Sequence, residues 1–198
     1  NRHCVTSQLL SAVKEQDCYS LCQTRRLVHE LKSKEIHLQR WRTTYALALE
    51  AGEKLRNTPS PETREFVDGQ ISRLQESWKD TELSLGEVIS RLQSTAETWD
   101  QCKKKIKKLK KRLQALKAQS EDPLPELHEA LHEEKELIKE VEKSLANWTH
   151  SLKELQTMKA DLSQHILAED VTVLKEQIQL LHRQWEDLCL RVSQSAAF

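Results

Sequence analysis

Two pairs of tryptophans stand the same distance apart in the sequence, and this spacing constrains the fold more than any other feature. Trp41 and Trp148 are 107 positions apart, and so are Trp78 and Trp185. Large apolar residues repeat at the same shift: Leu31 with Ile138, Leu38 with Leu145, Leu55 with Leu162, and Leu74 with Leu181. A fixed period that matches large apolar residues indicates one structural unit used twice. Serial units of this kind build rods and partner surfaces more often than enclosed active sites.

The composition favours long helices over folds that need many tight turns. Of the 198 residues, 31% are charged, 37% are hydrophobic, three are Gly and four are Pro. Few Gly residues and many charges are typical of helical rods. A unit of about 107 residues is long enough to bury a core of its own. The formal net charge is zero, so the chain as a whole has no charge excess that would attract nucleic acid or a membrane.

The spacing of apolar residues predicts one very long helix in the middle of the chain. From Val67 to Leu116, apolar residues recur at alternating steps of four and three, interrupted only by Thr81 and Thr95. This pattern predicts a continuous helix over about 62–118. At 1.5 Å per residue such a helix spans about 85 Å, which is too long for one compact unit. We expect it to end one repeat and to begin the next.

Each unit is predicted to be a bundle of three long helices that run up, down and up. Breaks are expected at 57–61, 120–125 and 168–170, with Ser60 and Asp122 as candidate helix caps. The predicted domains are residues 1–92, a repeat whose first helix is incomplete, and residues 93–198, a second repeat. We expect the incomplete helix to leave part of the first core uncovered. The predicted core markers are the five tryptophans: Trp41, Trp78, Trp99, Trp148 and Trp185.

Three helices in about 107 residues, with Trp99 in a first helix and Trp78 and Trp185 in third helices, resemble spectrin repeats. The resemblance covers essentially the whole chain. Within that superfamily, the stretches at 72–99 and 181–192 look most like the giant nesprins, whereas dystrophin, utrophin and the spectraplakins remain alternatives.

The nesprin resemblance implies a segment of a long cytoplasmic rod that links the outer nuclear membrane to actin or microtubule systems. It also implies a cytoskeletal or actin-regulatory partner, of the formin or bundler type. The membrane anchor and the actin-binding domains of that family do not occur in this sequence. The expected localisation is therefore cytoplasmic, with any attachment to the cytoplasmic face of the outer nuclear membrane made by other parts of such a protein.

A run of positive charge from Lys103 to Arg112 is the strongest candidate binding feature, because eight of its ten residues are basic. If the chain turns back near residue 122, this run lies antiparallel to about 129–142. The net of four negative charges there offsets only half of the eight positive ones. The bland interpretation is a solvated, salt-bridged face. The functional one is a docking surface for an acidic protein, formed by Lys104, Lys105, Lys108 and Lys111. Lipid and nucleic acid fit less well, since no aromatic residues interleave for base stacking.

Other motifs in the sequence are more economically explained by structure. His128 and His132 match the HExxH zinc motif, but the apolar pattern places both on an outer flank, and His150 lies too far along the helix to be a third ligand. Cys18 and Cys22 are four residues apart and could form a metal or redox pair, although half-buried helical cysteines are commoner. The sequon at Asn147 is read as a coincidence. The five cysteines do not repeat at the 107-residue shift, which favours a reducing compartment.

The sequence therefore predicts an all-α, non-enzymatic structural and docking module made of two tandem spectrin repeats. No cofactor, small-molecule substrate, nucleic acid or direct membrane insertion is expected. Recognition would use the outer faces of the helices near the repeat junction. The alternative is a passive mechanical spacer with no partner of its own.

Overall fold

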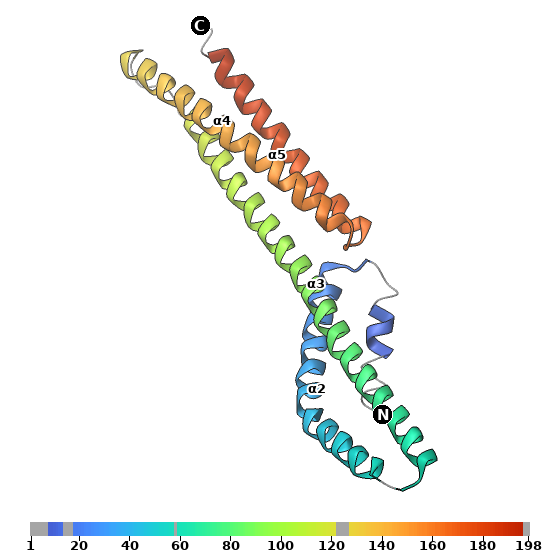
Figure 1. The fold of residues 1–198 in the computed structure, drawn as a ribbon. Helices are drawn as coiled ribbons and strands as arrows, with labels where there is room; N and C mark the ends of the chain where they lie inside the picture. The colour runs from blue at the N-terminus through green and yellow to red at the C-terminus, as the bar shows by residue number, and fades with distance from the viewer. Residues whose placement is uncertain (1–7, 14–17, 58, 122–126, 196–198) are drawn as a thin grey trace. The chain divides into compact units, whose positions relative to one another are not determined.

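The computed structural model describes residues 8–13, 18–57, 59–121 and 127–195. Every long regular element in these ranges is a helix: α2 (Leu21–Arg56), α3 (Pro61–Glu121), α4 (Leu127–Ser163) and α5 (Ala168–Ser195). A short helical stretch at 8–13 precedes them (Figure 1). The predicted all-α fold is confirmed. Within the described helices, no segment combines the length and apolar character that crossing a bilayer requires.

The chain divides into two compact units, Asn1–Ala96 and Glu97–Phe198. Helix α3 contributes residues to both units, and it extends from Pro61 to Glu121 without a break. Thr81 and Thr95 are buried in it, and their hydroxyl groups donate to the carbonyls of Ser77 and Arg91, four residues earlier. These hydroxyl groups are thereby satisfied inside the helix. The repeat boundary expected between residues 92 and 93 stays a prediction.

Polar residues just outside the helices fix where they begin. Ser20 caps α2: its hydroxyl oxygen accepts from the Gln23 backbone N–H at 3.2 Å, and the Gln23 side chain accepts from the Ser20 N–H at 2.9 Å. This reciprocal capping box satisfies two backbone donors that a helix start leaves open. Ser60 caps α3 in the predicted way, with its hydroxyl 3.4 Å from the Thr63 nitrogen. Asp122, the other predicted cap, lies outside the described residues.

The break before α5 differs from the prediction. It lies at 164–167, and α5 begins at Ala168, so that Glu169 and Asp170 occupy its first turn. The sequence pattern had favoured a break at 168–170. Carboxylates in the first turn of a helix interact favourably with the positive end of the helix dipole. These two residues therefore start the helix.

Unit 2 has a core made by the α3 residues from Glu97 onward together with α4 and α5, and α4 and α5 lie side by side in opposite directions (Figure 1). Trp148 of α4 stacks on Trp185 of α5 with ring centroids 4.5 Å apart. Each fully buried aliphatic side chain contributes about 1.5–3 kcal/mol to stability relative to exposure. The other buried apolar residues are Trp99, Cys102, Ile106, Leu109, Leu113, Leu116, Val141, Leu155, Leu162, Ile166, Leu174, Ile178, Leu181, Leu188 and Val192.

Unit 1 has a core that covers only part of its helices. The buried cluster contains Leu10, Val13, Tyr19, Leu31, Leu38, Trp78, Leu85, Val88, Ile89 and Leu92. The first-helix part that the structure describes is confined to the stretch at 8–13. Residues that are buried in unit 2 are therefore open at the matching positions of unit 1. Leu55 is 54% exposed where Leu162 is 1% exposed, and Leu74 is 38% exposed where Leu181 is fully buried.

Trp41 is the one tryptophan for which the core prediction is wrong. It is 43% exposed, whereas its counterpart Trp148 is 3% exposed. In unit 1 the stacking partner of Trp78 is Tyr45, which lies one turn after Trp41 on α2; the ring centroids are 4.4 Å apart. Tyr45 corresponds to Leu152 in the second unit, so the aromatic pair has moved along the helix. The period places a tryptophan at residue 41, but burial also requires a third helix over it.

Candidate docking surface on the second unit

The basic run lies on the first helix of unit 2, and its apolar residues separate the core from the solvent. Ile106 and Leu109 are buried, together with Cys102 before the run and Leu113 after it. Lysines between these positions face outward because residues one and two positions away from a core residue lie on other faces of the helix. Lys104, Lys108 and Lys111 are exposed, whereas Lys105 is half-buried. The four predicted binding lysines thus fall into two environments.

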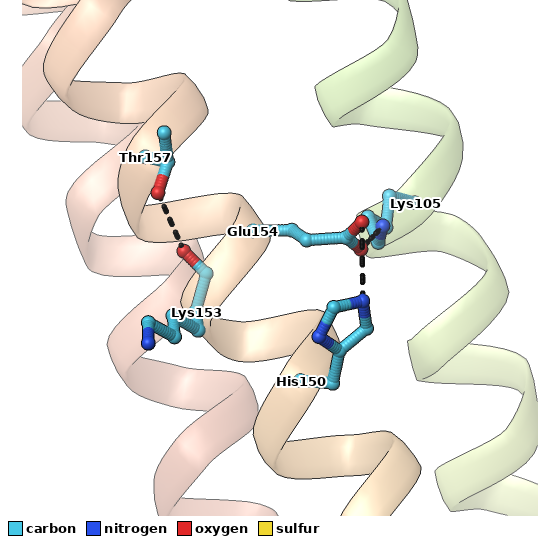
Figure 2. Close-up of polar contacts among 5 residues, drawn as sticks. All are labelled: Lys105, His150, Lys153, Glu154 and Thr157. Carbon is cyan, nitrogen blue, oxygen red and sulfur yellow. Dashed lines mark hydrogen bonds and ion pairs between the residues drawn. The ribbon is translucent and has the colours of Figure 1, made fainter.

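Lys105 is held by a carboxylate on α4. Figure 2 shows the ammonium group of Lys105 paired with the carboxylate of Glu154. Glu154 also lies near His150, which is on α4 as well. His150 Nε2 is 3.5 Å from the Glu154 carboxylate. Lys153, in contrast, points away from α3 in this view, and its backbone carbonyl accepts from the Thr157 hydroxyl at 3.1 Å. The positive charge of Lys105 is therefore already offset within the unit.

Arg112 makes the second link between α3 and α4. Its Nη2 is 3.2 Å from a Glu140 carboxylate oxygen and 2.7 Å from the Ser144 hydroxyl. Ser144 is only 2% exposed, while its neighbour Leu145, which matches the buried Leu38 at the 107-residue shift, is 49% exposed. The match between Leu38 and Leu145 therefore does not extend to their burial. The hydroxyl of Ser144 has a guanidinium partner at this core-edge position, which offsets the cost of burying a polar group.

The two ion pairs also correct the predicted alignment of the helices. Lys105 pairs with Glu154 and Arg112 with Glu140, so the basic run faces about 140–154 and not 129–142. The shift is about three helical turns. The facing stretch holds three glutamates against two lysines, a net of one negative charge where four had been expected. On the side of α4, the run is therefore less compensated than the sequence suggests.

Glu136, which belongs to the stretch 129–142, forms an ion pair within its own helix. Lys139 Nζ lies 2.9 Å from a Glu136 carboxylate oxygen. This hydrogen bond lowers the pKa of Glu136 and raises that of Lys139. Both groups are fully exposed, so the pair is screened by solvent and adds little to stability.

Among the residues that the structure describes, Lys105 and Arg112 are the members of the run with a recorded carboxylate partner. Lys103 instead lies over the Trp99 ring, 5.9 Å from its centroid. The exposed lysines Lys104, Lys108 and Lys111 carry charges that no described carboxylate offsets by direct contact. Such a surface can attract an acidic partner over about a Debye length, which is about 8 Å at physiological salt.

The remaining sequence motifs acquire no site geometry. His128 of the HExxH match belongs to a stretch whose side chains lie outside the description, and His132 is exposed. In the described ranges, no cluster of three or more His, Cys, Asp or Glu residues could hold a metal ion. Cys18 is half-buried and Cys22 is exposed, and no disulfide joins them. Asn147 of the sequon is exposed beside the buried Trp148.

The chain resembles a known protein along nearly its whole length. It is 71% identical over 188 residues to human Nesprin-2, and the match covers 95% of this chain but 3% of that relative. No protein-family model matches the chain. No solved structure matches it either. This identity, carried on an all-helical fold with a 107-residue period, places the chain with the nesprin-type spectrin-repeat proteins.

Proposed function

We propose that this chain is a structural, non-enzymatic segment of a long rod that links the nucleus to the cytoskeleton. The proposal is supported by the 71% identity to human Nesprin-2 and by long helices with continuous apolar seams. The chain spans only 3% of that relative, so the linking function and a position at the cytoplasmic face of the nuclear envelope belong to the longer protein. The segment itself contributes length, stiffness and surface.

We further propose that unit 2 docks a partner through Lys104, Lys105, Lys108 and Lys111. The partner is a cytoskeletal or actin-regulatory protein of the formin or bundler type, with an acidic surface. The observation that carries this proposal is the alignment of α3 with α4, which places the run of eight basic residues beside an α4 stretch whose net charge is only one negative. A salt-bridged rod face with no binding role would be expected to balance its own charges more closely.

A pull-down from cytoplasmic extract, read by mass spectrometry, tests the docking function. The variant reverses Lys104, Lys108 and Lys111 to Glu and keeps Lys105, because a carboxylate there would repel Glu154 and disturb the fold. The matched control reverses the exposed residues Lys79, Lys153 and Lys175, which changes the net charge equally. We expect a specific partner that the native chain and the control capture and the variant loses.

A passive spacer is the second candidate function. It predicts that no specific partner is captured by any of the three chains, each with an unchanged helical circular dichroism spectrum. That result would overturn the docking proposal and leave the structural one in place.

A further inference from the structure

A groove between α3 and α4 divides the basic run in a way that the sequence does not show. It has a volume of about 300 Å³ and lies within unit 2. The α3 wall carries Lys105, Lys108 and Arg112, while the α4 wall carries Asn147 and Ser151. Lys104 and Lys111 do not line it. The four lysines proposed for docking are therefore not equivalent.

The charges of the groove leave one cation for an incoming ligand. Lys105 and Arg112 are engaged by Glu154 and Glu140. Lys108 lies between them on the same wall, three residues beyond Lys105 and four before Arg112. It is exposed, and within the described ranges no carboxylate pairs with it. No acidic residue lines the groove itself.

The opposite wall supplies neutral hydrogen-bond donors beside His150, whose Nε2 lies 3.5 Å from the Glu154 carboxylate. Asn147 offers an amide N–H₂ group and Ser151 a hydroxyl group, both on the α4 wall across from Lys108. Trp148 and Leu109 add apolar surface to the lining. A single ammonium group beside an amide and a hydroxyl group suits one carboxylate, which can accept several hydrogen bonds at once. Apolar surface suits the methylene groups of a glutamate side chain.

We infer that this groove is the specific part of the docking surface and that it receives a carboxylate side chain of an acidic segment in the partner protein. Lys108 and Asn147 bind the carboxylate directly, while Lys104 and Lys111 add only long-range attraction. This inference rests on the proposed docking function. A concave site between two helices suits a side chain better than the flat surface of a bilayer. A nucleic acid would need exposed aromatic rings for stacking, and the run has none.

The test is a titration of the full 198-residue chain with a fluorescein-labelled hexaglutamate peptide at low salt, followed by fluorescence anisotropy. We expect Lys108→Gln to weaken binding about three- to fivefold, the effect of losing one exposed ion pair. The matched controls Lys104→Gln and Lys111→Gln remove the same charge and should change the affinity by less than about twofold. Asn147→Ala, which changes no charge, should weaken binding measurably.

The neutral substitution separates a built site from diffuse attraction. Equal weakening by all three lysine variants, together with no effect of Asn147→Ala, would overturn the groove. Absence of saturable peptide binding would overturn it as well, and so would vesicles of anionic lipid that bind in the same Lys108-dependent way. A captured partner that survives Lys108→Gln but not the triple reversal would reject the groove and keep the docking function. Peptide binding with the expected pattern, but without a captured partner, would keep the groove as a carboxylate site and reject the docking function.

Discussion

Single tryptophans show how burial depends on the whole unit and not on sequence period alone. Trp41 and Trp148 occupy matching positions in the two repeats, but Trp148 is buried and stacked on Trp185. Trp41 is 43% exposed. The same residue type at the same repeat position should therefore have very different energetic importance.

Replacement of these two residues by alanine tests this difference. Trp148→Ala should lower the free energy of unfolding by about 3–5 kcal/mol, because it removes buried contacts and leaves a cavity. Trp41→Ala should cost about 1–2 kcal/mol, because solvent fills the space and no cavity remains. Urea unfolding followed by circular dichroism measures both values. Equal losses would show that Trp41 is as buried in solution as Trp148.

Cys102 predicts a pH dependence of stability. The thiol is fully buried, and burial raises its pKa from the ordinary value of 9.0 to about 11, against the opposing charge of Lys105. Below pH 9 the thiol is protonated in both folded and unfolded chains, so this group makes no difference. Between about pH 9 and 11 the unfolded chain releases the proton first, and the folded chain therefore loses stability as the pH rises.

Cys102→Ala is the control for this effect, because it removes the titrating group. Urea midpoints of the native chain and the variant should converge as the pH rises from about 9 to 11. A constant difference across that range would contradict a raised thiol pKa.

At the scale of the helix, replacing a glycine by alanine can increase stability where the added methyl group has room. A methyl group added at Gly69 would contact nothing within 4 Å, whereas one added at Gly52 on α2 would lie 2.9 Å from Ile71. Glycine inside a helix costs about 0.5–1 kcal/mol relative to alanine. We expect Gly69→Ala to raise the free energy of unfolding by that amount, and Gly52→Ala to gain less because Ile71 must move. Thermal unfolding of the two variants measures both changes in stability. A larger increase for Gly52→Ala than for Gly69→Ala would be inconsistent with this packing.

The helices themselves could be predicted from the sequence, but their alignment could not. Apolar steps of four and three identify the seam of α3, and Ser60 marks its start, because both are local properties of the chain. The axial position of α4 beside α3 depends on packing and on the connection between them. The predicted partner stretch was consequently displaced from the Glu140 and Glu154 that the structure shows.

The same limit explains why Ser144 is buried and its neighbour Leu145 is exposed. The two residues are neighbours near the edge of the seam, and the period alone does not distinguish them. Arg112 on α3 donates a hydrogen bond to the Ser144 hydroxyl, and this contact favours the burial of Ser144. The lysines of the candidate site were visible as a run in the sequence. Their division into groove-lining and outward-facing residues required the facing helix.

At the scale of the whole chain, zero net charge conceals a local imbalance. The formal charges sum to zero over 198 residues, yet a run of eight basic residues on α3 lies beside a stretch of α4 with a net of one negative charge. Association steered by such a surface should be fast and should weaken with salt.

The affinity of the captured partner at two salt concentrations tests the docking claim most directly. For the native chain and the Lys79, Lys153 and Lys175 control, binding should weaken strongly between about 50 and 200 mM salt, because the attraction is screened. The chain with Lys104, Lys108 and Lys111 reversed to Glu should bind at least about tenfold more weakly at the lower salt. Equal affinity and equal salt dependence of all three chains would contradict docking through the basic surface of unit 2.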